Sequence, residues 1–289
     1  MNYDSIQKMV DHATHEGVNI SDLILKDQSI EMEMDEQAIF DKMANSFSVM
    51  EKAADEGMRA NEKSASGLTG CDAYKIKQRL DNNVSVGGKI VTAMIARAIG
   101  VAERNACMGK IVAAPTAGSC GILPAALITI QEEHEIPREK IIMSLLTASA
   151  LGMVISENAS VAGAKGGCQA ECGSAAAMAA GAIVEAMGGT PEMVGHACAI
   201  AIKSILGLVC DPVGGLVEVP CVKRNASGAM NALTAAELAL AGVESYIPAD
   251  EVILTMKAVG DTMPPSLKET SKGGLAATNT AKHFSLDKK

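Results

Sequence analysis

Apolar residues recur at helical spacing along most of the chain. In the segment from residue 35 to residue 57 they are three or four positions apart, at Ile39, Met43, Phe47 and Met50. This spacing places side chains on one face of an α-helix. Asp35 is a typical N-terminal cap for such a helix, and Gly57 is a typical residue at a helix end. The pattern therefore predicts an amphipathic helix between these two residues.

The first 60 residues are polar and amphipathic, whereas the rest of the chain is richer in glycine and in small apolar residues. Ser21 is expected to cap a helix that includes Leu23. We interpret residues 1–60 as an N-terminal helical arm and residues 61–289 as one main helical domain. Most of the charged side chains on the arm are expected to face solvent.

From Ser64 onward, glycine-rich loops alternate with helices made of small apolar residues. Helices are expected over 83–106, 123–134, 137–155, 172–187, 191–209, 226–241 and 248–259. Thr190, Pro191 and Glu192 give the clearest helix start, because they supply a capping hydroxyl, a proline suited to the first turn and an acid near the positive end of the helix.

The composition favours an all-α fold. Aromatic residues make up only 2% of the chain and Trp is absent, while Gly and Met are abundant. Such a core is expected to consist of closely packed helices, with methionine filling irregular gaps. Strands rich in Val, Ile and aromatic residues at regular intervals, which a β-sandwich or a doubly wound sheet requires, are not found.

Charge and hydropathy exclude several function classes. The net charge of −9 opposes binding to nucleic acid or to an anionic membrane. No predicted helix reaches the roughly 18 uninterrupted apolar residues of a membrane span. The N-terminus lacks the basic and apolar regions of a secretory signal, so we expect a cytoplasmic protein. In that reducing compartment the eight cysteines are expected to be metal ligands, reactive thiols or core residues.

Three cysteines are candidate metal ligands because they lie in or beside glycine-rich loops: Cys168, Cys210 and Cys221. Loops at helix ends can direct several thiolates at one point, whereas a cysteine on an apolar helix face usually only packs. The spacing lacks the paired knuckles of a structural zinc site. The remaining cysteines are expected to pack in the core or to lie near the site without binding metal: Cys71, Cys107, Cys120, Cys172 and Cys198.

Two loops combine hydroxyl groups with backbone amides and are candidate binding sites for a substrate carboxylate. Their candidate residues are Ser66, Gly67, Thr69 and Gly70 in the first loop, and Thr116, Gly118 and Ser119 in the second. The same residue types also form ordinary capped turns. Histidine is scarce, and His196 on an apolar helix is expected to be a core residue. The general base is therefore unassigned.

Five segments, in this order, resemble the iron-sulfur L-serine dehydratases, and specifically the α chain of the two-chain form. The segments are Ser-Gly-Leu-Thr-Gly-Cys (66–71), Ala-Pro-Thr-Ala-Gly-Ser-Cys-Gly-Ile-Leu-Pro (114–124), Gly-Cys-Gln-Ala-Glu-Cys-Gly-Ser-Ala (167–175), Cys-Asp-Pro-Val-Gly-Gly-Leu-Val-Glu-Val-Pro-Cys (210–221) and Met-Pro-Pro-Ser-Leu-Lys-Glu-Thr (263–270). The likeness extends from about residue 20 to residue 278.

The resemblance implies a helical lyase that converts L-serine to pyruvate and ammonia, a reaction of amino-acid degradation and gluconeogenesis. It implies a 4Fe-4S cluster on Cys168, Cys210 and Cys221, with one iron open to the substrate. It also implies a separate β chain, on which the unassigned base could lie, and thus a hetero-oligomer.

Three alternatives stay open at this point. A related L-cysteine desulfidase would eliminate sulfide instead of water. A non-catalytic thiolate-metal module would hold zinc or a fully ligated cluster. A pyridoxal phosphate enzyme would need a Schiff-base lysine, for which Lys165 is the one candidate. Lys165 is better explained as a positive charge beside an anionic cluster.

Overall fold

The computed structural model describes residues 3–284, and every regular element in that range is a helix. Two isolated bridges, Lys63 with Gly70 and Cys210 with Lys268, are the extended pairings found there. The predicted all-α fold is confirmed.

Eleven long helices form the body of the protein: α1 (Ile6–Glu16), α2 (Ile20–Glu31), α3 (Glu36–Arg59), α4 (Asp72–Asp81), α5 (Gly88–Ala106), α6 (Ile122–Glu133), α7 (Arg138–Asn158), α9 (Ser174–Ala186), α10 (Pro191–Lys203), α11 (Cys221–Leu240) and α12 (Ala249–Thr262). Shorter helical turns join them: α8 (Gly163–Gly166), the π-helical η1 (Gln169–Gly173), the 3₁₀-helical η2 (Val213–Gly215), η3 (Pro265–Leu267) and η4 (Gly274–Ala277), and α13 (Asn279–Lys282).

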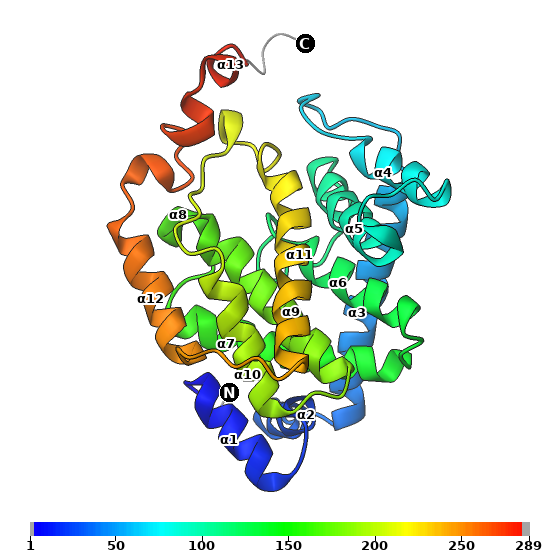
Figure 1. The fold of residues 1–289 in the computed structure, drawn as a ribbon, viewed down its shortest axis with the longest axis vertical. Coiled ribbons are helices and arrows are strands. Elements are labelled where there is room, and N and C mark those ends of the chain that lie inside the picture. Colours follow the sequence, from blue (N-terminus) through cyan, green and yellow to red (C-terminus); the bar gives the residue numbers. More distant parts are fainter. Residues whose placement is uncertain (1–2, 285–289) are drawn as a thin grey trace.

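Helix α9 is the centre of the fold. It packs against α6, α7, α10 and α11, as Figure 1 shows. Every residue of α9 except Glu185 is buried, and most of these residues are alanine. A helix that is apolar on all sides must be enclosed by other helices, and its small side chains let those helices approach closely.

Helix α7 raises the question of a membrane span. Within residues 3–284 it is the one helix that is long and apolar enough to cross a bilayer, yet 67% of its apolar window is buried inside the protein. This burial is typical of a core helix in a soluble protein. The cytoplasmic location stays a prediction.

Several predicted helix ends are correct and several are wrong. Asp35 caps α3 by accepting a hydrogen bond from the Gln37 amide, and the Thr190 hydroxyl caps α10. Ser21 lies inside α2, whose N-cap is Asn19, so that prediction was wrong by two residues.

Three predicted ranges were also wrong. The expected helix over 226–241 already begins at Cys221. The expected helix over 83–106 begins only at Gly88, after the separate helix α4, which the sequence analysis did not identify. The expected helix over 191–209 ends at Lys203, and Gly207, with a φ of 88°, lies in the turn that follows. A left-handed residue cannot continue an α-helix.

Gly57 does not end α3, which continues to Arg59. It lies where α3 crosses α5, and a Cβ atom at this position would lie 2.1 Å from the main-chain oxygen of Gly100. The missing side chain therefore permits close helix packing, and this role rather than chain termination explains the glycine.

Substituting Gly57 with alanine is expected to lower the free energy of unfolding, toward the upper end of the about 1–3 kcal/mol typical of overpacked cores. The neighbouring atoms belong to the backbone, so α3 and α5 must move apart. Gly195→Ala in α10 is the matched control, because its Cβ would meet nothing closer than 3.5 Å. Urea unfolding of both variants measures the difference; equal stability of the two would contradict this account of the crossing.

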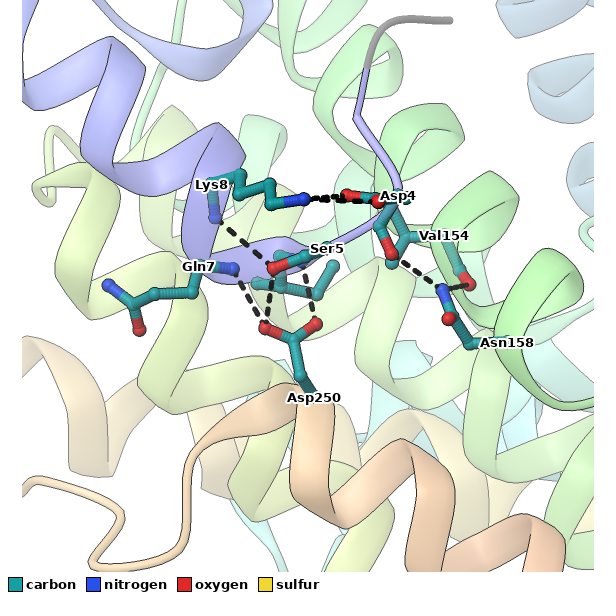
Figure 2. Close-up of polar contacts among 8 residues, drawn as sticks. Asp4, Ser5, Gln7, Lys8, Val154, Asn158 and Asp250 are labelled. Atoms are coloured by element: carbon teal, nitrogen blue, oxygen red, sulfur yellow. Dashed lines mark hydrogen bonds and ion pairs between the residues drawn. The ribbon is translucent and has the colours of Figure 1, made fainter.

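The start of α1 is fixed by a residue from the far end of the sequence. Asp250, in the first turn of α12, accepts hydrogen bonds from the Ser5 hydroxyl at 2.8 Å and from the amides of Ile6 and Gln7 at 2.7 and 3.0 Å. Figure 2 shows this carboxylate directed at the first backbone amides of the helix, which have no partner within the helix itself. Buried residues of α1–α3 also belong to the same core as those of α5–α12. The division at residue 60 stays a prediction.

Glu185 is the one charged residue of α9, and its side chain lies between α9, α7 and α2. It accepts hydrogen bonds from the Thr147 hydroxyl at 2.7 Å and from the Ser21 amide at 3.3 Å. Burial raises its pKa despite these bonds, because a carboxylate loses hydration inside the protein.

The raised pKa of Glu185 predicts a pH-dependent cost. Below the ordinary pKa of a glutamate the carboxyl is protonated in both states; above it the unfolded chain loses the proton first, so stability decreases until the folded carboxyl also ionises. Glu185→Gln keeps an acceptor for Thr147 but cannot ionise. The stability of this variant relative to wild type should therefore rise as the pH increases from about 4 to 8, as chemical unfolding at each pH would show. A difference that is constant with pH would contradict the prediction.

Candidate active site

The three candidate ligands come from three separate segments. Cys168 directly precedes η1, Cys221 is the first residue of α11, and Cys210 lies in the loop between α10 and α11. The main chain of Cys210 is held on both sides by the C-terminal segment: its amide donates to the Leu267 carbonyl at 2.9 Å, and its carbonyl accepts from the Glu269 amide at 2.8 Å. All three side chains are buried.

The thiols of these cysteines lie within electrostatic reach of one another. Burial is the main cause that raises the pKa of Cys221 to about 12 and the pKa of Cys210 above its usual range. In both cases the charge of Cys168 raises the pKa further. Gly163 provides the space beside Cys210, because a Cβ at that glycine would lie 2.9 Å from the sulfur.

Cys168 differs from the other two because its pKa is lowered. The main cause is a hydrogen bond with Cys172, whose sulfur lies 3.3 Å away, and the guanidinium of Arg224 contributes as well. The pKa of Cys172 is raised well above its usual value by the same contact and by burial. Cys168 is therefore the thiol that ionises most readily, and the Cys172 thiol is its hydrogen-bond partner.

Arg224 supplies positive charge beside the buried cysteines. It lies one turn after Cys221 on α11 and forms an ion pair with Asp211 at 2.9 Å. It also donates to the Val209 carbonyl at 2.8 Å and makes a hydrogen bond with Cys168. The guanidinium thus links two of the cysteine-bearing segments.

A single metal ion does not explain this arrangement. In the described part of the chain, no three His, Cys, Asp or Glu side chains are grouped closely enough to hold one ion. Cys168, Cys210 and Cys221 are the thiols that could hold a larger group, in which each sulfur binds a different metal atom.

The second loop expected to bind substrate lies against the first cysteine segment. The Thr116 hydroxyl donates to Glu171, which is three residues after Cys168, and contacts the Ser119 hydroxyl at 3.0 Å. A Cβ at Gly118 would lie 2.6 Å from Glu171 Oε1. Burial raises the pKa of Glu171, and the Thr116 hydrogen bond opposes this shift.

Asn225 joins the same loop to the helix that carries Cys221. Its side-chain amide donates to the carbonyls of Gly118 at 2.8 Å and Cys221 at 3.0 Å, while its oxygen accepts from the Gly121 amide at 2.8 Å. Asn225 is completely buried, so these bonds fix the loop relative to α11.

The first loop expected to bind substrate uses most of its donors inside the protein. The Ser66 hydroxyl donates to Glu218 at 2.8 Å, and the Gly70 amide donates to Glu103 at 3.1 Å. The Gly67 amide closes a turn on the Ser64 carbonyl at 2.9 Å. Thr69 is buried, and its hydroxyl has no hydrogen-bond partner in the described structure.

The remaining candidates have ordinary surroundings. Cys120 and Cys198 are buried, and burial raises the pKa of each to about 12. Cys71 and Cys107 are half-buried. His196 accepts a hydrogen bond from the Ser245 amide at 3.2 Å but is half-buried, so it lies at the edge of the core and not inside it.

Three residues of this region were missed by the sequence analysis: Glu171, Glu218 and Arg224. Glu171 was visible between two cysteines, and Arg224 follows Cys221 at the spacing of one helical turn. Glu218 lies in the loop between Cys210 and Cys221 and holds the Ser64 and Ser66 hydroxyls. Only the tertiary partners of these charges reveal their roles.

Comparison with known proteins matches residues 15–276 to the family described as serine dehydratase alpha chain. The chain is 47% identical to a probable L-serine dehydratase, alpha chain, from Bacillus subtilis, over 99% of this chain and 95% of that protein. It is 42% identical to an L-serine dehydratase, alpha chain, from Peptoniphilus asaccharolyticus, over 98% of this chain and 97% of that protein. An L-serine dehydratase from Streptomyces coelicolor is 40% identical over 91% of this chain, which covers 58% of that longer protein.

Proposed function

The chain belongs to the serine dehydratase alpha chain family, and we propose that it is the catalytic subunit of an enzyme that converts L-serine to pyruvate and ammonia. The observation that carries this proposal is that three buried thiols, from three segments, lie within electrostatic reach of one another, two of them beside Arg224. This arrangement lies next to hydroxyl-bearing loops, as a site for a small polar substrate requires.

The donor set fits a 4Fe-4S cluster on Cys168, Cys210 and Cys221. Soft thiolates are the usual ligands of such clusters, and their buried negative charge needs a compensating cation, which Arg224 provides. The space at Gly163, which any side chain would fill against the Cys210 sulfur, leaves room beside one ligand.

When bound, a cluster with three protein ligands supplies one iron as a Lewis acid for the substrate hydroxyl. The chain's own residues have other tasks. Arg224 and the Cys172 thiol stabilise the Cys168 thiolate. Asn225 holds the 116–121 loop against α11, so that the side chains of this loop keep a fixed position relative to Cys221.

In the overall reaction the Cα–H and Cβ–O bonds break, water leaves, and the resulting enamine hydrolyses to pyruvate and ammonia. We propose that a β chain completes the enzyme and supplies the base for the Cα proton. Support comes from the names of the alpha-chain relatives and from the longer Streptomyces protein, of which this chain covers 58%.

Replacing Cys168, Cys210 or Cys221 with alanine is expected to abolish the cluster and to lower pyruvate release from L-serine at least about 100-fold, because each removes one ligand. Protein reconstituted with iron and sulfide without oxygen, and mixed with a candidate β chain, would be assayed for bound iron, visible absorption and pyruvate.

Cys198→Ala is the matched control, since Cys198 is also a buried thiol but lies on α10. It should keep both the cluster and the activity. Wild-type protein that binds no iron, or ligand variants with unchanged absorption, would refute the cluster. Faster pyruvate release from L-cysteine than from L-serine would favour a desulfidase.

A further inference from the structure

Glu171 holds a carboxylate beside the cysteines that has no cationic partner in the described structure. The side chain is half-buried and accepts one side-chain hydrogen bond, from Thr116. Arg224, the cation that acts on it through space, forms its ion pair with Asp211 instead. Charged side chains that leave water are normally paired. Glu171 is therefore available to pair with a cation from outside the chain.

The hydroxyls next to Glu171 offer acceptors rather than donors. With Glu171 ionised, Thr116 donates its one hydroxyl proton to the carboxylate. The completely buried Ser119 hydroxyl contacts Thr116 at 3.0 Å and the Ala114 carbonyl at 3.5 Å, so its one proton also stays within the protein. Both hydroxyl protons are thus used within the protein, and what is left for a ligand is a carboxylate and hydroxyl lone pairs.

An acceptor-only site with a negative charge binds an ammonium group, which has three donors and no acceptor. It repels a carboxylate. From this geometry we infer that Glu171, with Thr116, binds the α-ammonium group of the substrate and so selects amino acids over hydroxy acids. This inference rests on the proposed function, and it assigns the 116–119 loop to the opposite end of the substrate from the carboxylate expected from the sequence.

The position of Glu171 fits this role. Its charge raises the pKa of Cys168, Cys210 and Cys221, so it lies within electrostatic reach of all three proposed cluster ligands. Gly118 lies directly against the carboxylate, because a Cβ at this position would lie 2.6 Å from Oε1. The side chain of Glu171 is nevertheless only half-buried, so the carboxylate is close to the proposed reaction centre and partly exposed.

The test compares Glu171→Gln with wild type in the cluster-loaded α chain combined with its β chain. The amide keeps a hydrogen bond but loses the charge, so the KM for L-serine should rise about 10- to 100-fold. The inhibition constant of 3-hydroxypropanoate, which is serine without its amino group, should change less than about twofold. Glu185→Gln is the matched control, a half-buried carboxyl on α9 away from the cysteines, and should change neither value.

Three results overturn the inference: an unchanged KM for L-serine, an equal rise in both constants, or the same selectivity change in Glu185→Gln. If iron analysis shows that Glu171→Gln has lost the cluster, Thr116→Val and Thr116→Ser replace it. The valine variant should raise the KM for L-serine alone and the serine variant should restore it; equal effects on inhibitor and substrate would again overturn the inference. Wild-type enzyme that releases no pyruvate from L-serine is a separate failure, that of the proposed function.

Discussion

The burial of three neighbouring thiols, two of them beside the Arg224 guanidinium, is the constraint on which the rest of this site depends. Burial opposes ionisation of Cys210 and Cys221, whose pKa values are raised, and a negative charge on Cys168 opposes it further. Thiolates together in a protein interior need positive charge, and Arg224 provides part of it. Iron in a cluster would provide the rest of the positive charge, and it would thereby stabilise three thiolates that lie close together.

Close helix packing brings these thiols together. Alanine-rich α9 allows its neighbours to approach on all sides, and Gly57 allows α3 to cross α5 at its backbone. The loops at the ends of these helices are then fixed by buried polar residues such as Asn225. The site therefore depends on core packing far from the cysteines, because a shift of α11 would move both Cys221 and the 116–121 loop.

Much of the fold could be predicted from the sequence. Helical spacing and composition indicated the all-α class, and local capping chemistry located the starts of α3 and α10 at Asp35 and Thr190. Gly57 was misinterpreted because a glycine needed for helix packing has the same local appearance as a glycine at a helix end. That distinction depends on Gly100, 43 residues away, and no local pattern contains it.

The site was predictable only in its residue types. Glycine loops indicated which cysteines could turn toward a common point, but not that the donors of the 66–70 loop have partners within the chain. Likewise, the sequence cannot show that Thr116 donates to Glu171, which reverses the charge preference of that loop. Hydrogen-bond direction depends on which acceptor the fold places nearby.

The most direct test of the account is the Mössbauer spectrum of protein reconstituted with ⁵⁷Fe, recorded with and without L-serine. If three cysteines hold a cluster with one iron open to substrate, one iron site of the four should change on serine addition while the other three stay as they were. A spectrum in which serine leaves every iron site unchanged while pyruvate is released, or in which no cluster is present, would contradict the account.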